Sequence, residues 1–307
     1  MKEKINHAIK IICFLAFCLI LFSYAYWNGG SIDSIVKVSV LLSAENSEQW
    51  EILRHGINSF AKENKIEVNY INLTGEESVQ EQMDIIRREL QNGAEGFIVN
   101  LPNKNVLVKQ INESLNQEKL VMVGSSLPLD FECGYINVDS KAMGRDLAYA
   151  ALEDIPDSKR LGILIGNRDM KAVNECLEGV KEVLGEQIAF IAFKPEEIAK
   201  KDWKKAEGVL CLDTKAGELL LEEAEKGNKK LYVIGRTEKL VYYLDKGLID
   251  TMMVTDEFVM GYTALESLFS QVRYYGEIEN KTVSYILINK QNLYSEDNER
   301  IVFPWVQ

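Results

Sequence analysis

The sequence predicts an α/β protein built from two doubly wound parallel sheets. Short apolar runs rich in β-branched residues alternate with longer segments in which apolar residues recur every three or four positions. This alternation runs through two consecutive cycles along the chain. Strand and helix in alternation favour a parallel sheet covered on both faces, because each crossover must pack a helix back onto the sheet. About five strands in each cycle fit two domains better than one large sheet.

The first 35 residues differ from this pattern. Lys2, Lys4 and Lys10 precede an unbroken apolar run at residues 11–22. Such a run is typical of a secretory signal or a single membrane anchor. Basic residues ahead of it predict that the N-terminus stays inside and that everything after Gly30 lies outside.

Two fates of this segment are open. The unbroken run is shorter than the roughly 20 residues of a full span, and Ser23 and Ala25 are small enough for a cleavage site, so the bulk of the chain would be secreted if cleavage followed Ala25. The run ends in aromatic residues typical of a membrane interface, such as Trp27. We favour an uncleaved anchor through residues 8–27, which holds the bulk of the chain outside the cell membrane.

The first cycle opens with a buried strand, because alternate residues from Val36 to Leu42 are apolar. Trp50, Leu53 and Ile57 then recur at helical spacing, and Trp50 falls close to the loop that joins this strand to its helix. That position allows two interpretations, an aromatic packed on the core or a platform on which a ligand stacks. We expect strands at 37–42, 66–72, 96–100, 120–124 and 135–138, and helices near 49–63, 77–92, 104–117 and 143–154.

The second cycle begins at Arg160 and repeats the pattern. We expect strands at 160–165, 188–193, 208–212, 231–234 and 251–255, and helices near 173–184, 196–205, 217–226 and 238–246. A helix at 257–272 and a strand at 283–288 remain, and these return to the first and second domains respectively. The expected parts are a signal or anchor at 1–35, a first lobe at 36–138 plus 256–275, and a second lobe at 139–255 plus 281–307.

Composition excludes several classes of function. A net charge of −12 without a basic patch argues against nucleic acid as a partner. Five cysteines at unrelated spacings do not form a disulfide framework. Two histidines are too few to make a zinc site or a histidine-dependent catalytic triad an attractive interpretation. The sequence carries no phosphate loop or dinucleotide fingerprint. We therefore expect a protein that is not an enzyme and that needs no cofactor or metal.

Several segments, in order and spacing, resemble a type I extracytoplasmic solute-binding protein of the ribose-binding and lac-repressor-core superfamily. They are VSVLLSAENSEQWEILRHG, GAEGFIVN, YINVDSKAMG, VNECLEGVKEVL and LYVIGRTEKLVYYLDKGLIDTMMVTDEFVMGYTALESL. A repressor would carry a helix-turn-helix ahead of the first strand, where this chain has its hydrophobic segment.

The resemblance implies two lobes joined by three crossing segments, near residues 138–139, 255–256 and 274–281, that close over a ligand. It implies a receptor for a small polar, carbohydrate-like ligand or a small anion, presented to an ABC transporter permease or to a sensor histidine kinase in two-component sensing. The ligand-binding candidates carried over are Glu45, Asn46, Trp50, Asn100, Ser125, Ser126, Asp139, Asn174, Asp213, Arg236, Thr237, Thr255 and Asp256.

Two departures from the sugar-binding pattern bear on the ligand. Ser125 and Ser126 stand where such members carry an Asp-Arg pair, and Asn174 stands where an arginine is often found. The ligand would then be smaller, less hydroxylated or anionic, with Arg236 as its counter-charge. The alternative is a membrane-anchored signalling module with a degenerate cleft that acts through protein contacts. Asp139 and Asp213 are also well placed to cap the helices that follow them.

Overall fold

The computed structural model describes residues 14–20, 23, 35–43, 47–73, 79–101, 105–115, 119–124, 127–155, 160–167, 170–193, 206–223, 229–278 and 280–304. The chain divides into two compact units, residues 1–35 and residues 36–307. In the first unit, residues 14–20 are helical. Among the described residues, none of the helices has both the length and the apolar character that a membrane crossing requires. The anchor at 8–27 falls mostly outside the described residues and stays a prediction.

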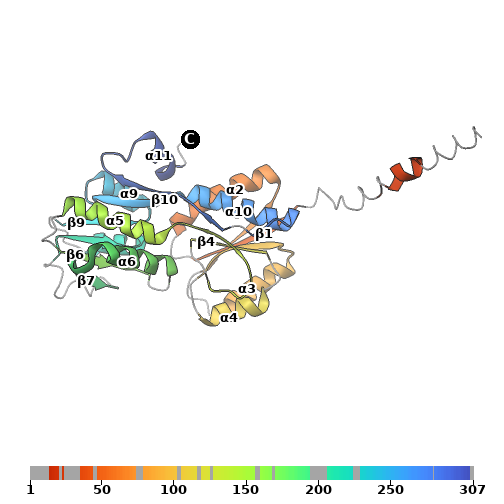
Figure 1. Cartoon of the computed structure of the whole chain (residues 1–307), viewed down its shortest axis with the longest axis horizontal. Helices are drawn as coiled ribbons and strands as arrows, with labels where there is room; N and C mark the ends of the chain where they lie inside the picture. The colour runs from red at the N-terminus through yellow and green to blue at the C-terminus, as the bar shows by residue number, and fades with distance from the viewer. Residues whose placement is uncertain are drawn as a thin grey trace, which may run out of the picture. The chain divides into compact units, whose positions relative to one another are not determined.

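The first lobe is built on a six-stranded parallel sheet in the order β11-β5-β4-β3-β1-β2. Its strands are β1 (Lys37–Ser43), β2 (Glu67–Leu73), β3 (Gly96–Asn100), β4 (Lys119–Val123), β5 (Gly134–Asn137) and β11 (Asn280–Thr282). One face is covered by α2 (Ser47–Asn64) and α10 (Glu257–Tyr274), and the other by α3 (Val79–Gln91) and α4 (Asn105–Ser114) (Figure 1). Both faces are therefore buried, as the continuous apolar strands require.

The second lobe has a six-stranded sheet in the order β12-β10-β9-β8-β6-β7. Its strands are β6 (Leu161–Leu164), β7 (Ile188–Ala192), β8 (Gly208–Cys211), β9 (Lys230–Ile234), β10 (Thr251–Thr255) and β12 (Tyr285–Asn289). The helices are α5 (Ser140–Asp154), α6 (Lys171–Leu184), α8 (Thr214–Glu223), α9 (Glu238–Asp245) and α11 (Glu296–Val302), with a short 3-10 turn, η2 (Gly185–Gln187). The two doubly wound lobes confirm the predicted fold class. The helix expected at 196–205 lies outside the described residues.

The end of the chain differs from the prediction. The strand expected at 283–288 is present as β12, which pairs antiparallel with β10 in the second sheet, but the sequence did not predict β11, which pairs with β5 in the first. Lys281 and Thr282 therefore lie in the first sheet, although the sequence pattern places residues 281–307 in the second lobe. The third crossing falls at Val283 and Ser284 rather than at 274–281. β11 consists of three polar residues, so no apolar pattern marks it as a strand in the sequence.

Backbone hydrogen bonds join the three crossing segments to one another. The Val283 N–H donates to the carbonyl of Asn137 at 2.8 Å, and the Asp256 N–H donates to the carbonyl of Ser284 at 3.1 Å. The third crossing thus bonds to the first on one side and to the second on the other. This arrangement fixes how the lobes face each other while leaving only a few residues whose dihedral angles must change when the lobes move.

Glycine allows a close helix crossing in each lobe. In the first lobe α2 crosses α10, and a Cβ added at Gly56 or Gly261 would overlap a backbone carbonyl oxygen of the facing helix. In the second lobe α5 crosses α6, and a Cβ added at Gly144 or Gly179 would likewise overlap a backbone carbonyl oxygen of the facing helix. Ridge-into-groove packing keeps helix axes 8–10 Å apart with ordinary side chains. The glycines bring the backbones into direct contact and fix the two helix pairs that flank the cleft.

Candidate ligand-binding cleft

A cavity of about 130 Å³ lies between the two sheets of residues 36–307. It adjoins the carboxyl ends of strands in both lobes, since Asn100 closes β3, Asn167 follows β6 and Thr255 closes β10. In open α/β sheets ligands bind outside these strand ends. A cavity needs roughly 10–15 Å³ to hold one water molecule, so this one has room for about ten water-sized groups. A small ring ligand is the size that fits.

A second and larger cavity, of about 530 Å³, lies at the β5–β11 edge of the first lobe and includes Lys171 of the second. Its wall is internally bonded, because Tyr135 Oη donates to the Leu127 carbonyl and the Tyr135 N–H donates to Asn280 Oδ1. Of the predicted ligand residues that the structure describes, four line the smaller cavity and none lines this one. The smaller cavity is therefore the candidate site.

The first-lobe wall combines an aromatic side chain with hydrogen-bond acceptors. Trp50, in the first turn of α2, is 5% exposed, and it packs in the core of the first lobe while also lining the cavity. Both interpretations of Trp50 are thus compatible with its position. Asn100 is buried, and its Nδ2 donates to the Val123 carbonyl at 2.7 Å. Its Oδ1 has no hydrogen-bond partner among the described residues. Glu257, the first residue of α10, is also buried and lines the cavity.

Asp213 holds the second-lobe wall together. Its Oδ1 accepts from the Ala216 N–H at 2.8 Å, and its Oδ2 accepts from the N–H groups of Gly166 at 2.8 Å and Asn167 at 3.0 Å. One carboxylate therefore caps α8 and fixes the loop after β6. Burial raises the pKa of Asp213 above its ordinary value, and the three N–H donors oppose that rise. Asp213 lines the cavity, as does Thr255.

Three other predicted residues cap helices. Asp139 accepts from the Ala142 N–H at 2.8 Å at the start of α5, and Asp256 accepts from the Val259 N–H at 3.0 Å at the start of α10. Thr237 accepts from the Leu240 N–H at the start of α9. None of the three capping side chains lines the cavity. An aspartate or threonine directly after a strand satisfies the first N–H groups of the next helix, so its position alone does not distinguish a cap from a ligand group.

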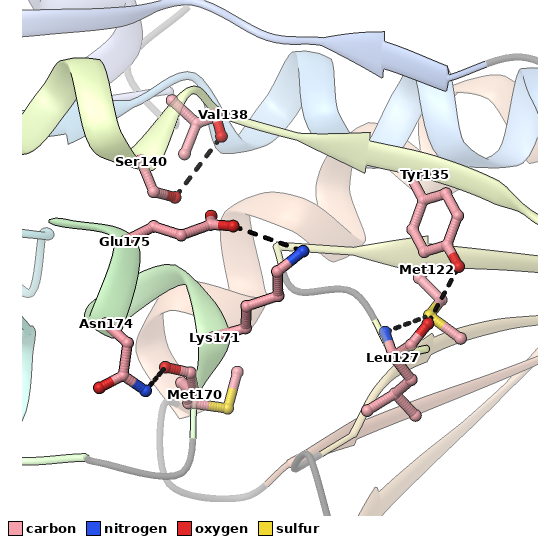
Figure 2. A network of polar contacts seen from close by, with 9 residues as sticks. All are labelled: Met122, Leu127, Tyr135, Val138, Ser140, Met170, Lys171, Asn174 and Glu175. Carbon is pink, nitrogen blue, oxygen red and sulfur yellow. Dashed lines mark hydrogen bonds and ion pairs between the residues drawn. The ribbon is translucent and has the colours of Figure 1, made fainter. Parts of the chain in front are cut away.

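Arg236 and Asn174 also lie outside the cavity lining. Arg236 is buried, and its Nε donates to the Val302 carbonyl at 3.0 Å, which ties the strand end to α11. Asn174 Nδ2 donates to the Met170 carbonyl at 3.1 Å at the start of α6 (Figure 2). The geometry thus gives no support to Arg236 as the counter-charge of an anionic ligand. Four predicted residues, Glu45, Asn46, Ser125 and Ser126, lie outside the described residues.

The sequence reasoning missed the apolar part of the cavity. Met143, Met170, Val173 and Cys176 line it from α5 and α6, and Met260 lines it from α10. Burial raises the pKa of the Cys176 thiol to about 12, so the thiol stays neutral at physiological pH. These residues follow the helical repeat of core positions, and their periodicity does not separate a residue facing the sheet from one facing the cleft. Only their location near the starts of the helices, close to the strand ends, could have indicated them.

Two lobes with a ring-sized cavity between their strand ends are the architecture of bilobal solute-binding proteins. Residues 38–277 match the family model described as a periplasmic binding protein domain, and the chain belongs to this family. A comparison with curated protein sequences gave no significant match.

Solved structures of low sequence identity share the fold. GanP, a glucose-galactose binding protein from Geobacillus stearothermophilus, is 18% identical with a TM-score of 0.73, over 85% of this chain and 100% of that one. An ABC transporter solute-binding protein from Burkholderia graminis, in complex with D-arabinose, is 15% identical with a TM-score of 0.76, over 85% and 97%. One from Agrobacterium vitis, bound with alpha-D-tagatopyranose, is 13% identical with a TM-score of 0.78, over 87% and 99%.

Proposed function

We propose that the chain is an extracytoplasmic solute-binding receptor, held by its N-terminal segment, that closes its two lobes over a small polar, sugar-like ligand. The observation that carries the proposal is the cavity itself, which takes its wall from strand ends and helix starts of both lobes. A ligand there gains contacts with both walls only when the lobes are closed, so it stabilises the closed state. The protein acts by binding and not by catalysis, and its partner is an ABC transporter permease or a sensor kinase.

The sugars named for the structural neighbours support a carbohydrate-like ligand. Those proteins bind D-arabinose or tagatose, or are described as glucose-galactose binding. Trp50 offers this chain an aromatic face for the apolar side of a ring, and Asn100 Oδ1 offers an acceptor for a hydroxyl.

A membrane-anchored signalling module with a degenerate cleft is the second candidate. It is favoured by Arg236 and Asn174, whose polar groups bond within the second lobe and do not line the cavity. Such a module would act through protein contacts. A ligand that stabilises the folded state separates the two candidates, because only a working site gives that effect.

The test is a thermal-shift screen of the full chain against monosaccharides, polyols, nucleosides and small carboxylates. A ligand at 100 times its dissociation constant adds about 2.7 kcal/mol of stability, or roughly 5–10 °C for a domain of this size. We expect a sugar-like compound to give this shift, and Trp50→Ala to abolish it.

Trp50 also packs in the core, so Trp50→Ala lowers the melting temperature by itself, and the ligand-induced shift is the quantity compared. Trp50→Phe, which keeps an aromatic ring at this position, should retain part of the shift. Tyr274→Ala, at a side chain 71% exposed, serves as the matched aromatic control and should retain all of it. A screen without any stabilising compound would favour the degenerate module.

A further inference from the structure

The α5 and α6 side of the second-lobe wall is apolar apart from Ser140. Met143 on α5, Met170 at the start of α6, and Val173 and Cys176 within α6 all line it, and Ile234 adds a further apolar side chain from the end of β9. Met143 and Ile234 are buried, as are Val173 and Cys176. A hydroxyl group placed against these side chains would lose its hydrogen bonds to water and gain none in return.

Polar residues line the rest of the second-lobe wall, and Asp213 and Ser140 are engaged within the protein. Asp213 accepts three backbone N–H groups, from Gly166, Asn167 and Ala216. Ser140 Oγ lies 3.5 Å from the Val138 carbonyl, to which it donates (Figure 2). Four further polar residues of the second lobe line the cavity from the loop after β6, the start of α8 and the end of β10, and not from α5 or α6: Asn167, Thr214, Lys215 and Thr255.

The first-lobe wall places two hydrogen-bond acceptors beside apolar side chains such as Trp50. Asn100 is 2% exposed, and its Nδ2 bond to the Val123 carbonyl holds the amide so that Oδ1 remains as an acceptor. Glu257 is 4% exposed and adds a carboxylate to the same wall. Both groups accept hydrogen bonds, so this wall recognises a ligand edge that carries hydroxyl donors.

We propose, on the basis of the proposed function, that the ligand is a partly deoxygenated sugar. Its hydroxyl-bearing edge faces Asn100 and Glu257 of the first lobe. Its deoxygenated edge lies against Met143, Met170 and Val173 of the second lobe. An apolar wall discriminates against an added hydroxyl by about 10- to 100-fold in affinity, because that hydroxyl would be buried without a partner.

The experiment measures the dissociation constants of the full chain for matched sugar pairs by isothermal titration calorimetry. The pairs are D-galactose with D-fucose, L-mannose with L-rhamnose, and D-ribose with 2-deoxy-D-ribose. We expect the deoxy member of at least one pair to bind about 10- to 100-fold more tightly than its partner. If the hydroxylated member binds at least as tightly in every pair that binds, the inference is overturned and the proposed function stands. If no sugar binds, the proposed function fails with it.

Met170→Gln tests whether the second-lobe wall sets this preference. The substitution keeps side-chain length and places an amide where the thioether lies, at a half-buried position. It should reduce the preference for the deoxy sugar about fivefold, since a new hydrogen bond to the added hydroxyl contributes about 1 kcal/mol. Val259→Gln, at a side chain 41% exposed and outside the cavity lining, should leave the preference unchanged. A preference unaltered by Met170→Gln in a protein of normal melting temperature would contradict the assigned orientation.

Discussion

Replacing Asp213 with alanine is expected to lower the free energy of unfolding by about 3 kcal/mol. The carboxylate accepts three backbone N–H groups, and each buried donor left without an acceptor costs about 1–3 kcal/mol. Part of the loss is offset because the buried charge, whose desolvation raises the pKa of Asp213, is also removed. The measurement is urea unfolding of the two proteins at neutral pH.

Asp213→Asn is the matched control. It keeps a carbonyl oxygen at the same distance from the backbone, so at least one of the three N–H groups retains its acceptor, and the loss should be smaller than for alanine. The same ranking should appear in ligand binding, because Asp213 fixes the loop that carries Asn167 into the cavity. Equal stability of the alanine variant and the native chain would show that Asp213 does not hold this wall.

Gly261→Ala is expected to destabilise the chain by about 3 kcal/mol, although alanine is the better helix former. The gain in helix propensity is about 1 kcal/mol. Against it, the new Cβ would overlap the Leu53 carbonyl oxygen, a backbone atom that cannot rotate away. Overpacking usually costs about 1–3 kcal/mol and occasionally more, and we expect about 4 kcal/mol here because the neighbour is a rigid backbone atom, so the clash outweighs the gain. Gly144→Ala should destabilise the chain by a similar amount, because its Cβ would overlap the Cys176 carbonyl oxygen in the second lobe.

Gly185→Ala provides the comparison for both glycine variants. Gly185 ends α6 with a φ of +48°, and a Cβ there would meet no atom within 4 Å. The cost is then that of the strained backbone conformation alone, about 2 kcal/mol. Thermal unfolding should rank Gly261→Ala and Gly144→Ala below Gly185→Ala. The reverse order would mean that the helix pairs separate without penalty, so that their crossing does not fix the cleft.

The alternation of strands and helices predicted both sheets. The spacing of apolar residues in each element depends on which of its faces is buried, so it is visible in a short stretch of sequence. The same logic placed four predicted residues on the cavity, since Trp50, Asn100, Asp213 and Thr255 lie near strand ends or helix starts. Strand ends of one sheet meet at one edge, so the strand pattern alone groups residues that are far apart in the chain.

What the sequence could not supply depends on tertiary contacts. Arg236 is at a strand end, yet its guanidinium turns to a carbonyl on α11, a helix distant in sequence. Met170 and Cys176 follow an ordinary helical repeat, and only the approach of the two lobes turns them into a cavity wall. The division of residues 280–289 between two sheets depends likewise on the partner strands, β5 and β10.

Hydrogen exchange of the full chain, with and without the most stabilising sugar, tests the central claim that one ligand joins both lobes. The account predicts slower exchange on both sides of the cavity, in the first turn of α2 and around Asn100 in the first lobe, and around Asn167, Met170 and Thr214 in the second. The α3 and α4 face of the first lobe should not change. Protection confined to one lobe, or located away from the cavity, would contradict closure over a ligand between them.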